Sequence, residues 1–106
     1  MKDAAAAWVA ESWWLASLGR TLVWARLRVR AGGTAEVLDS DSNTLGYDSE
    51  DTARAALMDA EFVAFDGLDA DDAAARGFSL DEVQPPQGDD DARLAARMVQ
   101  SLGGRA

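Results

Sequence analysis

The sequence predicts an α+β fold, a three-stranded antiparallel β-meander packed with a main helix, plus N-terminal and C-terminal helices. Apolar residues alternate with a period of two over Thr21–Arg30, which is typical of a strand, and recur at helical spacing after Asp48. The chain has 106 residues, 48% of them hydrophobic, which suits one folded unit. We therefore expect a single small acidic domain over residues 1–106.

The first element is predicted to be a helix over residues 3–18, because four consecutive alanines favour a helix and Asp3 is a suitable N-cap. The apolar side chains of this helix do not keep to one stripe. It would then carry more apolar surface than one small core can bury. Trp8, Trp14 and Leu15 are therefore predicted interaction residues, and a homodimer is expected to cover them.

The β-meander is predicted over about residues 20–47. Its first strand, Thr21–Arg30, has one apolar face and one face with three arginines, so we expect it to be half-buried. Gly32 and Gly33 can supply the turn into the second strand, and a third strand ends near Tyr47. The expected cross-strand neighbours are Val29 with Val37 and Arg30 with Glu36.

Three helices are predicted after the meander, over about residues 49–65, 70–76 and 90–102. Acidic residues in the first turn and an apolar face that includes Leu57 indicate the main helix at 49–65. Asp69 can cap the short helix at 70–76. Between the second and third helices the sequence alternates briefly and ends in two prolines, which favours an extended segment.

The charge is concentrated in the middle of the chain. The net charge is −9, and residues 39–91 hold sixteen acidic residues against two arginines, a net charge of −14. Such a field attracts basic protein surfaces or cations and repels nucleic acid and anionic membranes. Asp69, Asp71 and Asp72 are the predicted contacts for a partner with a basic surface.

The stretch DSDSNTLGYDSE has acidic and amide side chains at the spacing of an EF-hand calcium loop. Its candidate ligands are Asp39, Asp41, Asn43 and Glu50. The sixth loop position requires glycine and is Thr44, and the eighth, normally a branched aliphatic residue, is also unsuitable. We therefore expect a hairpin turn, a strand and a helix start, and keep a calcium-binding module as the alternative function.

Enzymatic function is not expected, and no cofactor or metal site is predicted. The chain contains no histidine and no cysteine, which removes the usual base at neutral pH and the usual zinc ligands. Arg26, Arg28 and Arg30 beside Trp24 resemble a surface for single-stranded nucleic acid, but the overall charge opposes such binding, and pairing with nearby acids is expected instead.

The sequence therefore predicts a non-enzymatic protein–protein interaction or regulatory module. One form of it is an acidic inhibitor or immunity-type protein that mimics the charge of nucleic acid and occupies a basic groove. Charged residues near the N-terminus fit neither a signal peptide nor a membrane span, so a cytoplasmic location is expected.

Overall fold

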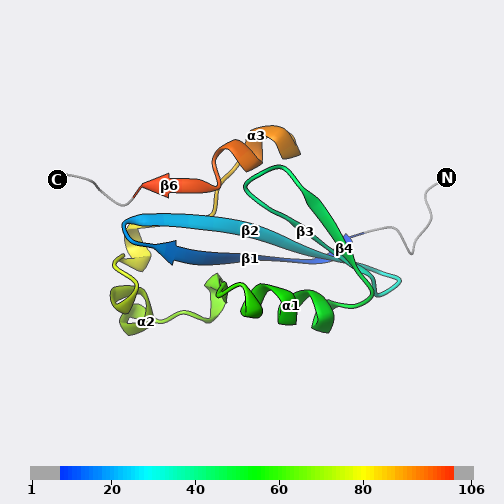
Figure 1. Ribbon diagram of the computed structural model, residues 1–106, viewed down its shortest axis with the longest axis horizontal. Coiled ribbons are helices and arrows are strands. Elements are labelled where there is room, and N and C mark those ends of the chain that lie inside the picture. The colour runs from blue at the N-terminus through cyan, green and yellow to red at the C-terminus, as the bar shows by residue number, and fades with distance from the viewer. Residues whose placement is uncertain (1–7, 102–106) are drawn as a thin grey trace.

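The computed structural model describes residues 8–101 and shows an antiparallel sheet of six strands with three α-helices (Figure 1). The predicted α+β class is confirmed, but the sheet is larger than the three strands expected. The strands are β1 (Trp8–Leu18), β2 (Thr21–Arg30), β3 (Ala35–Leu38), β4 (Thr44–Tyr47), β5 (Val63–Ala64) and β6 (Val99–Ser101). The helices are α1 (Glu50–Asp59), α2 (Ala70–Ala75) and α3 (Asp91–Ala96), with short 3-10 turns η2 (Phe65–Gly67) and η3 (Leu80–Glu82).

The long hairpin of β1 and β2 is the centre of the fold, and it corrects the prediction of an N-terminal helix. Residues 8–18 are a strand that pairs with β2 from Leu18 opposite Thr21 back to Trp8 opposite Arg30. Gly19 has a φ of 60°, a conformation that glycine adopts without strain in a two-residue hairpin turn. The start of the predicted helix, residues 3–7, lies outside the described residues.

The helix prediction failed because local preference was outweighed by pairing with β2. The tryptophans and Leu15 fit a strand, since Trp13 and Leu15 point to one face of the sheet and Trp14 to the other. The same residues had looked irregular as a helix, with no single apolar stripe. Apolar residues that form no single stripe on a helix can therefore belong to a strand that is buried on both faces.

The register between β2 and β3 differs from the prediction by two residues. Val29 lies opposite Ala35 and Arg28 opposite Glu36, because the turn occupies residues 31–33 and Gly33 donates a 2.8 Å hydrogen bond to the carbonyl of Arg30. The predicted partner of Arg30 is still reached, since its guanidinium pairs diagonally with Glu36. β4 then pairs with β3 in antiparallel fashion.

Two hydrophobic cores lie on opposite faces of the sheet, so the expectation of a half-buried β2 is wrong over its middle. One core, below the hairpin in Figure 1, joins the sheet to α1. It contains Trp14, Ala25, Leu27, Ala35, Val37, Ala53 and Leu57. The other joins the opposite face to α3 and to residues 73–83. It contains Leu15, Leu22, Trp24, Leu38, Ala73, Phe78, Val83, Leu94, Ala95 and Met98.

The helices are shorter than the predicted ones. α1 begins after the N-cap Ser49 and ends at Asp59, because Glu61 has a φ of 70° and the following residues pair with β1 as β5. α3 ends at Ala96, and β6 (Val99–Ser101) follows it within the predicted helix of about residues 90–102. In both places an apolar stretch that could continue a helix instead completes the sheet.

The short helix agrees best with its prediction. α2 spans Ala70–Ala75, and the Asp69 side chain caps it by accepting a 2.8 Å hydrogen bond from the Asp72 backbone N–H. The predicted extended segment at 78–83 instead contains the 3-10 turn η3. None of the described helices is long and apolar enough to cross a lipid bilayer.

Candidate functional site

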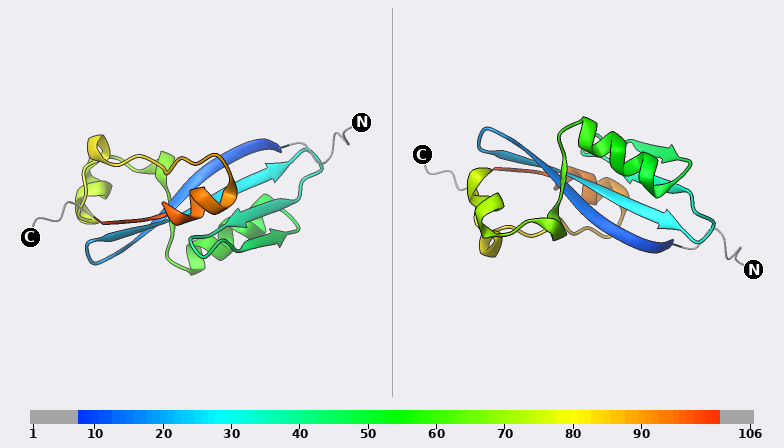
Figure 2. Two further views of the ribbon diagram at one scale, coloured as in Figure 1. Left: turned by 90° about the horizontal axis from the view of Figure 1, so that it is seen from above. Right: turned by 90° about the horizontal axis from the view of Figure 1, so that it is seen from below.

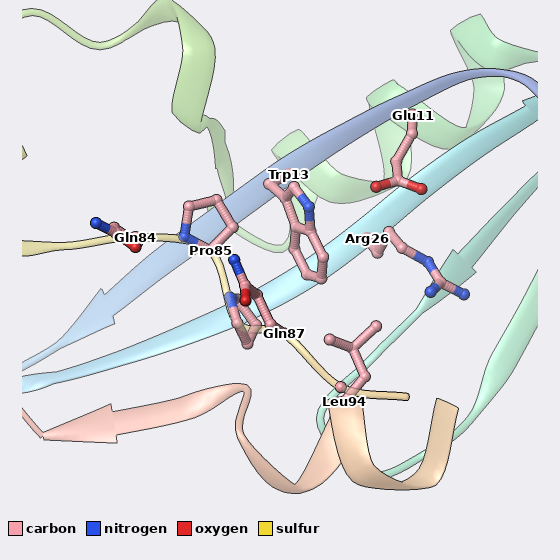
Figure 3. Close-up of a pocket in the computed structure, with 9 residues that line it drawn as sticks. Glu11, Trp13, Arg26, Gln84, Pro85, Gln87 and Leu94 are labelled. Atoms are coloured by element: carbon pink, nitrogen blue, oxygen red, sulfur yellow. The ribbon is translucent and has the colours of Figure 1, made fainter. Parts of the chain in front are cut away.

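A cleft of about 550 Å³ lies between the N-terminal half of β1 and the segment 84–88 (Figure 3). Trp13 projects into its centre, with Pro85 and Gln87 on one side and Leu94 below. Glu11 lies at the rim near Arg26. The complete lining is Glu11, Trp13, Arg26, Gln84, Pro85, Pro86, Gln87, Gly88 and Leu94. The cleft therefore combines an aromatic and proline-lined wall with charged and amide groups.

The segment 84–88 is held in place at its C-terminal end. The Arg97 guanidinium donates a 2.7 Å hydrogen bond to the carbonyl of Gln87. Gly88 approaches α3 so closely that a Cβ atom there would lie 2.7 Å from the backbone nitrogen of Leu94. A glycine is thus needed at this position for close packing, and the wall of the cleft is fixed by backbone contacts.

Arg26 places a charged side chain in the cleft although the residue is only 8% exposed. Its Nη2 donates a 3.1 Å hydrogen bond to Asp91 Oδ1, an ion pair that offsets part of the cost of burying the guanidinium. Its Nε is buried and has no acceptor among the described residues. The pairing with Asp91 therefore offsets part of the positive charge that Arg26 brings to the cleft.

Trp8 contacts two arginines farther along the same face of the sheet. The guanidinium carbons of Arg28 and Arg30 lie 4.1 and 4.4 Å from the centre of its ring, within the range of cation–π contacts. Burial, followed by the nearby positive charge of Arg26, lowers the pKa of the Arg28 guanidinium, and Asp91, Glu11 and Glu36 oppose this shift. Arg26, Arg28 and Arg30 therefore all make contacts within the protein, with Asp91, Glu36 or the Trp8 ring.

The predicted interaction residues of the N-terminal segment differ in their exposure to solvent. Trp14 and Leu15 are buried in the two cores, with exposures of 2% and 0%, so they are not available to a partner in this structure. Trp8 is 37% exposed and remains accessible. The homodimer was predicted from the surplus apolar surface of an N-terminal helix, but residues 8–18 form the strand β1. Homodimer formation stays a prediction.

The DSDSNTLGYDSE stretch forms the predicted turn, strand and helix start. The Asp39 carboxylate accepts hydrogen bonds from the backbone N–H groups of Asp41 and Asn43, at 2.9 and 3.0 Å. Glu50 lies in the first turn of α1, 3.6 Å from the Arg54 guanidinium. No group of three or more potential metal-binding side chains occurs within residues 8–101. The arrangement is that of a side-chain-stabilised hairpin turn.

The predicted acidic contacts lie on an exposed surface. All ten acidic residues between Glu50 and Glu82 are exposed, and the same stretch contains two arginines. We call these ten side chains the acidic surface. Asp69 and Asp72 form the capping box of α2, while Asp71 makes no such contact. α1 lies along the hairpin and α2 near its other end in Figure 1, and their buried residues belong to different cores, so the acidic surface extends over two separate helices.

Sequence reasoning did not find the cleft. Trp13 is half-buried and packs edge-on against the buried Trp24, with ring centres 6.1 Å apart. The helix interpretation of residues 3–18 hid the alternation that places Glu11 and Trp13 on one face. For segment 84–88 the sequence predicted only the end of an extended segment at Pro85 and Pro86. A strand interpretation of β1 would have revealed part of the site.

Comparison of the chain with protein-family models, with curated proteins and with solved structures gives no match in any of the three.

Proposed function

We propose that this protein is a non-enzymatic protein-binding module that recognises a partner with a basic surface. The observation that carries the proposal is the acidic surface, in which ten exposed carboxylates are accompanied by two arginines. A large excess of negative charge speeds association with a basic partner and makes the complex sensitive to salt. An inhibitor or immunity-type protein that occupies the basic groove of a nucleic-acid-binding protein would use such a surface.

The rigid support of the acidic surface favours recognition over simple charging of the protein. α1 is anchored to the sheet by the buried Ala53 and Leu57, and α2 by the buried Ala73. The backbone that carries these carboxylates is therefore held in place, which lowers the entropy that a complex must lose. The cation alternative is less well supported, because the Asp39 carboxylate already accepts two backbone hydrogen bonds.

The proposal can be tested by capture of partners from host extract on the immobilised full chain. The variant Asp59→Lys/Asp71→Lys reverses two charges on the acidic surface. Its control, Asp41→Lys/Asp89→Lys, makes the same change in net charge at exposed sites outside the Glu50–Glu82 stretch. A basic protein should be captured by the native chain and the control, released by rising salt, and lost with the first variant.

Two results would contradict the proposal. The first is a captured protein that binds the Asp59→Lys/Asp71→Lys variant as well as it binds the native chain. The second is equal loss of binding with both double variants, because the interaction would then depend on total charge rather than on the acidic surface. Circular dichroism of each variant should match the native spectrum, so that loss of folding is recognised.

A further inference from the structure

The outer edge of β1 is open over the N-terminal half of the strand. β2 pairs with β1 along one edge from residue 8 to residue 18, whereas on the other edge β5 pairs only with Trp14 and Leu15. Within residues 8–101, no strand pairs with the outer edge of residues 8–13. Both views of Figure 2 show this half of β1 at the margin of the sheet. Its outward backbone groups are therefore available to another strand.

The rest of the sheet shows how unusual this length of open edge is. β2 is covered on its second edge by β6 over Thr21–Val23 and by β3 over Arg26–Val29. Between these two, the Trp24 backbone N–H donates a 2.8 Å hydrogen bond to the carbonyl of Met98. The other free edges within the described residues belong to β4, β5 and β6, which have four, two and three residues. β1 thus offers the longest edge for strand addition.

The cleft adjoins this open edge. Glu11 and Trp13 lie opposite Arg28 and Arg26, and both line the cleft or its rim. A strand added to β1 would place every second side chain on this same face, opposite Glu11 and Trp13. Backbone pairing and the cleft would then act on one ligand, with the edge holding the main chain and the cleft selecting side chains.

The side chains beside the edge define what would fit. Glu11 is exposed and forms no ion pair with a described residue, so its cross-strand neighbour is best a lysine or arginine. Trp13, Pro85 and Leu94 present apolar surface, so the residue opposite Trp13 is best aromatic or aliphatic. Asp91 pairs with Arg26, which reduces the repulsion that a cation would meet in the cleft.

We propose that residues 8–13 of β1 bind an extended segment of another protein by strand addition. The segment carries a basic residue opposite Glu11 and, two positions away, an apolar residue that enters the cleft beside Trp13. This site is separate from the acidic surface, rests on different residues and has a different occupant, an extended chain rather than a folded basic surface. Either proposal can therefore fail without the other.

A labelled synthetic peptide tests the proposal directly. The probe is a peptide of about eight residues, with threonine at most positions and with phenylalanine and lysine two positions apart, made in both orders because the strand direction is open. Binding to the full chain is followed by fluorescence anisotropy and by amide chemical shifts in NMR spectra. One control peptide has glutamate in place of lysine, and another has a central proline that removes a backbone donor.

The expected result is saturable binding that shifts the amide signals of residues 10–13 and 84–88, with weaker binding of both control peptides. Glu11→Lys should weaken binding of the lysine peptide by about 2- to 30-fold, because an attractive charge pair is replaced by a repulsive one. The same variant should strengthen binding of the glutamate peptide. Asp59→Lys makes the same charge change on α1 and should leave the ratio between the two peptides unchanged.

Several outcomes would overturn the proposal. The absence of saturable binding of either order at about 1 mM peptide means that the edge does not take such a segment. Amide shifts confined to α1 and α2 would assign binding to the acidic surface. If the amides of β1 are protected from hydrogen exchange without peptide, and this protection rises with protein concentration, a second copy of the chain occupies the edge. Glu11→Gln, which is less disruptive, provides a second variant if Glu11→Lys unfolds.

Discussion

Leu57→Ala is expected to destabilise the protein by about 2 to 3 kcal/mol. Leu57 is 6% exposed and belongs to the core that joins α1 to Trp14 and Val37 on the sheet. Removing three carbon atoms from a buried site costs about 2.4 kcal/mol at roughly 0.8 kcal/mol for each carbon. An unfilled cavity adds to this cost, and a site that can rearrange reduces the addition.

The surroundings of Leu57 place the expected value in the lower part of the range for such substitutions. Leu57 already lines an open cavity of about 160 Å³, together with Leu45, Tyr47 and Phe62. Because Leu45 is 48% exposed and Tyr47 and Phe62 are only half-buried, these side chains have room to move into the vacated space. We therefore expect a small additional penalty from the new cavity.

Urea unfolding followed by tryptophan fluorescence measures this change in the free energy of unfolding. The matched control is Met58→Ala, the next residue on α1, which is 57% exposed and should change stability by less than about 0.5 kcal/mol. The dependence of the unfolding free energy on urea should stay the same for all three proteins. Equal midpoints for Leu57→Ala and Met58→Ala would refute the assignment of Leu57 to the face of α1 that packs on the sheet.

Three further predictions concern the cap of α2, the DSDSN turn and association. Asp69→Ala should lower the free energy of unfolding in urea by about 1 kcal/mol, because it removes the cap of α2. Asp71→Ala removes a carboxylate outside the capping box and should lower it less. Equal losses of stability would contradict the role of Asp69. Millimolar calcium should not raise the melting temperature, because the Asp39 carboxylate is used within its turn; a saturable increase that Asp41→Ala abolishes would revive the calcium site. Sedimentation equilibrium should give about twice 11.3 kDa if the predicted homodimer forms, with Trp8→Ala weakening it; a mass of one chain at all micromolar concentrations would disprove it.

Local sequence signals determined several elements by themselves. Asp69 and the alanines after it specify α2, because a capping box and high helix propensity act within one turn of the chain. Asp39 specifies its hairpin turn through hydrogen bonds to backbone groups two and four residues away. Such contacts are short-range, so they are visible in the sequence without knowledge of the sheet.

The tertiary structure decided the nature of the N-terminal segment and the end of the main helix. Residues 8–18 become β1 because β2 pairs with almost the whole segment, and Val63–Ala64 become β5 because β1 pairs with them in turn. The pairing of β5 with β1 joins residues that are distant along the chain. The free energy gained from backbone pairing and burial in the sheet exceeds the small helix preference of each residue.

The candidate sites divide in the same way. The excess of acidic residues was evident from the sequence, because charge is a property of composition, and every one of those carboxylates between Glu50 and Glu82 is exposed. The cleft depends on bringing Trp13 of β1 next to Pro85 and Leu94, more than seventy residues later in the chain. Only the folded arrangement of the sheet and segment 84–88 creates that proximity, since no local pattern specifies which distant segment will cover an exposed face.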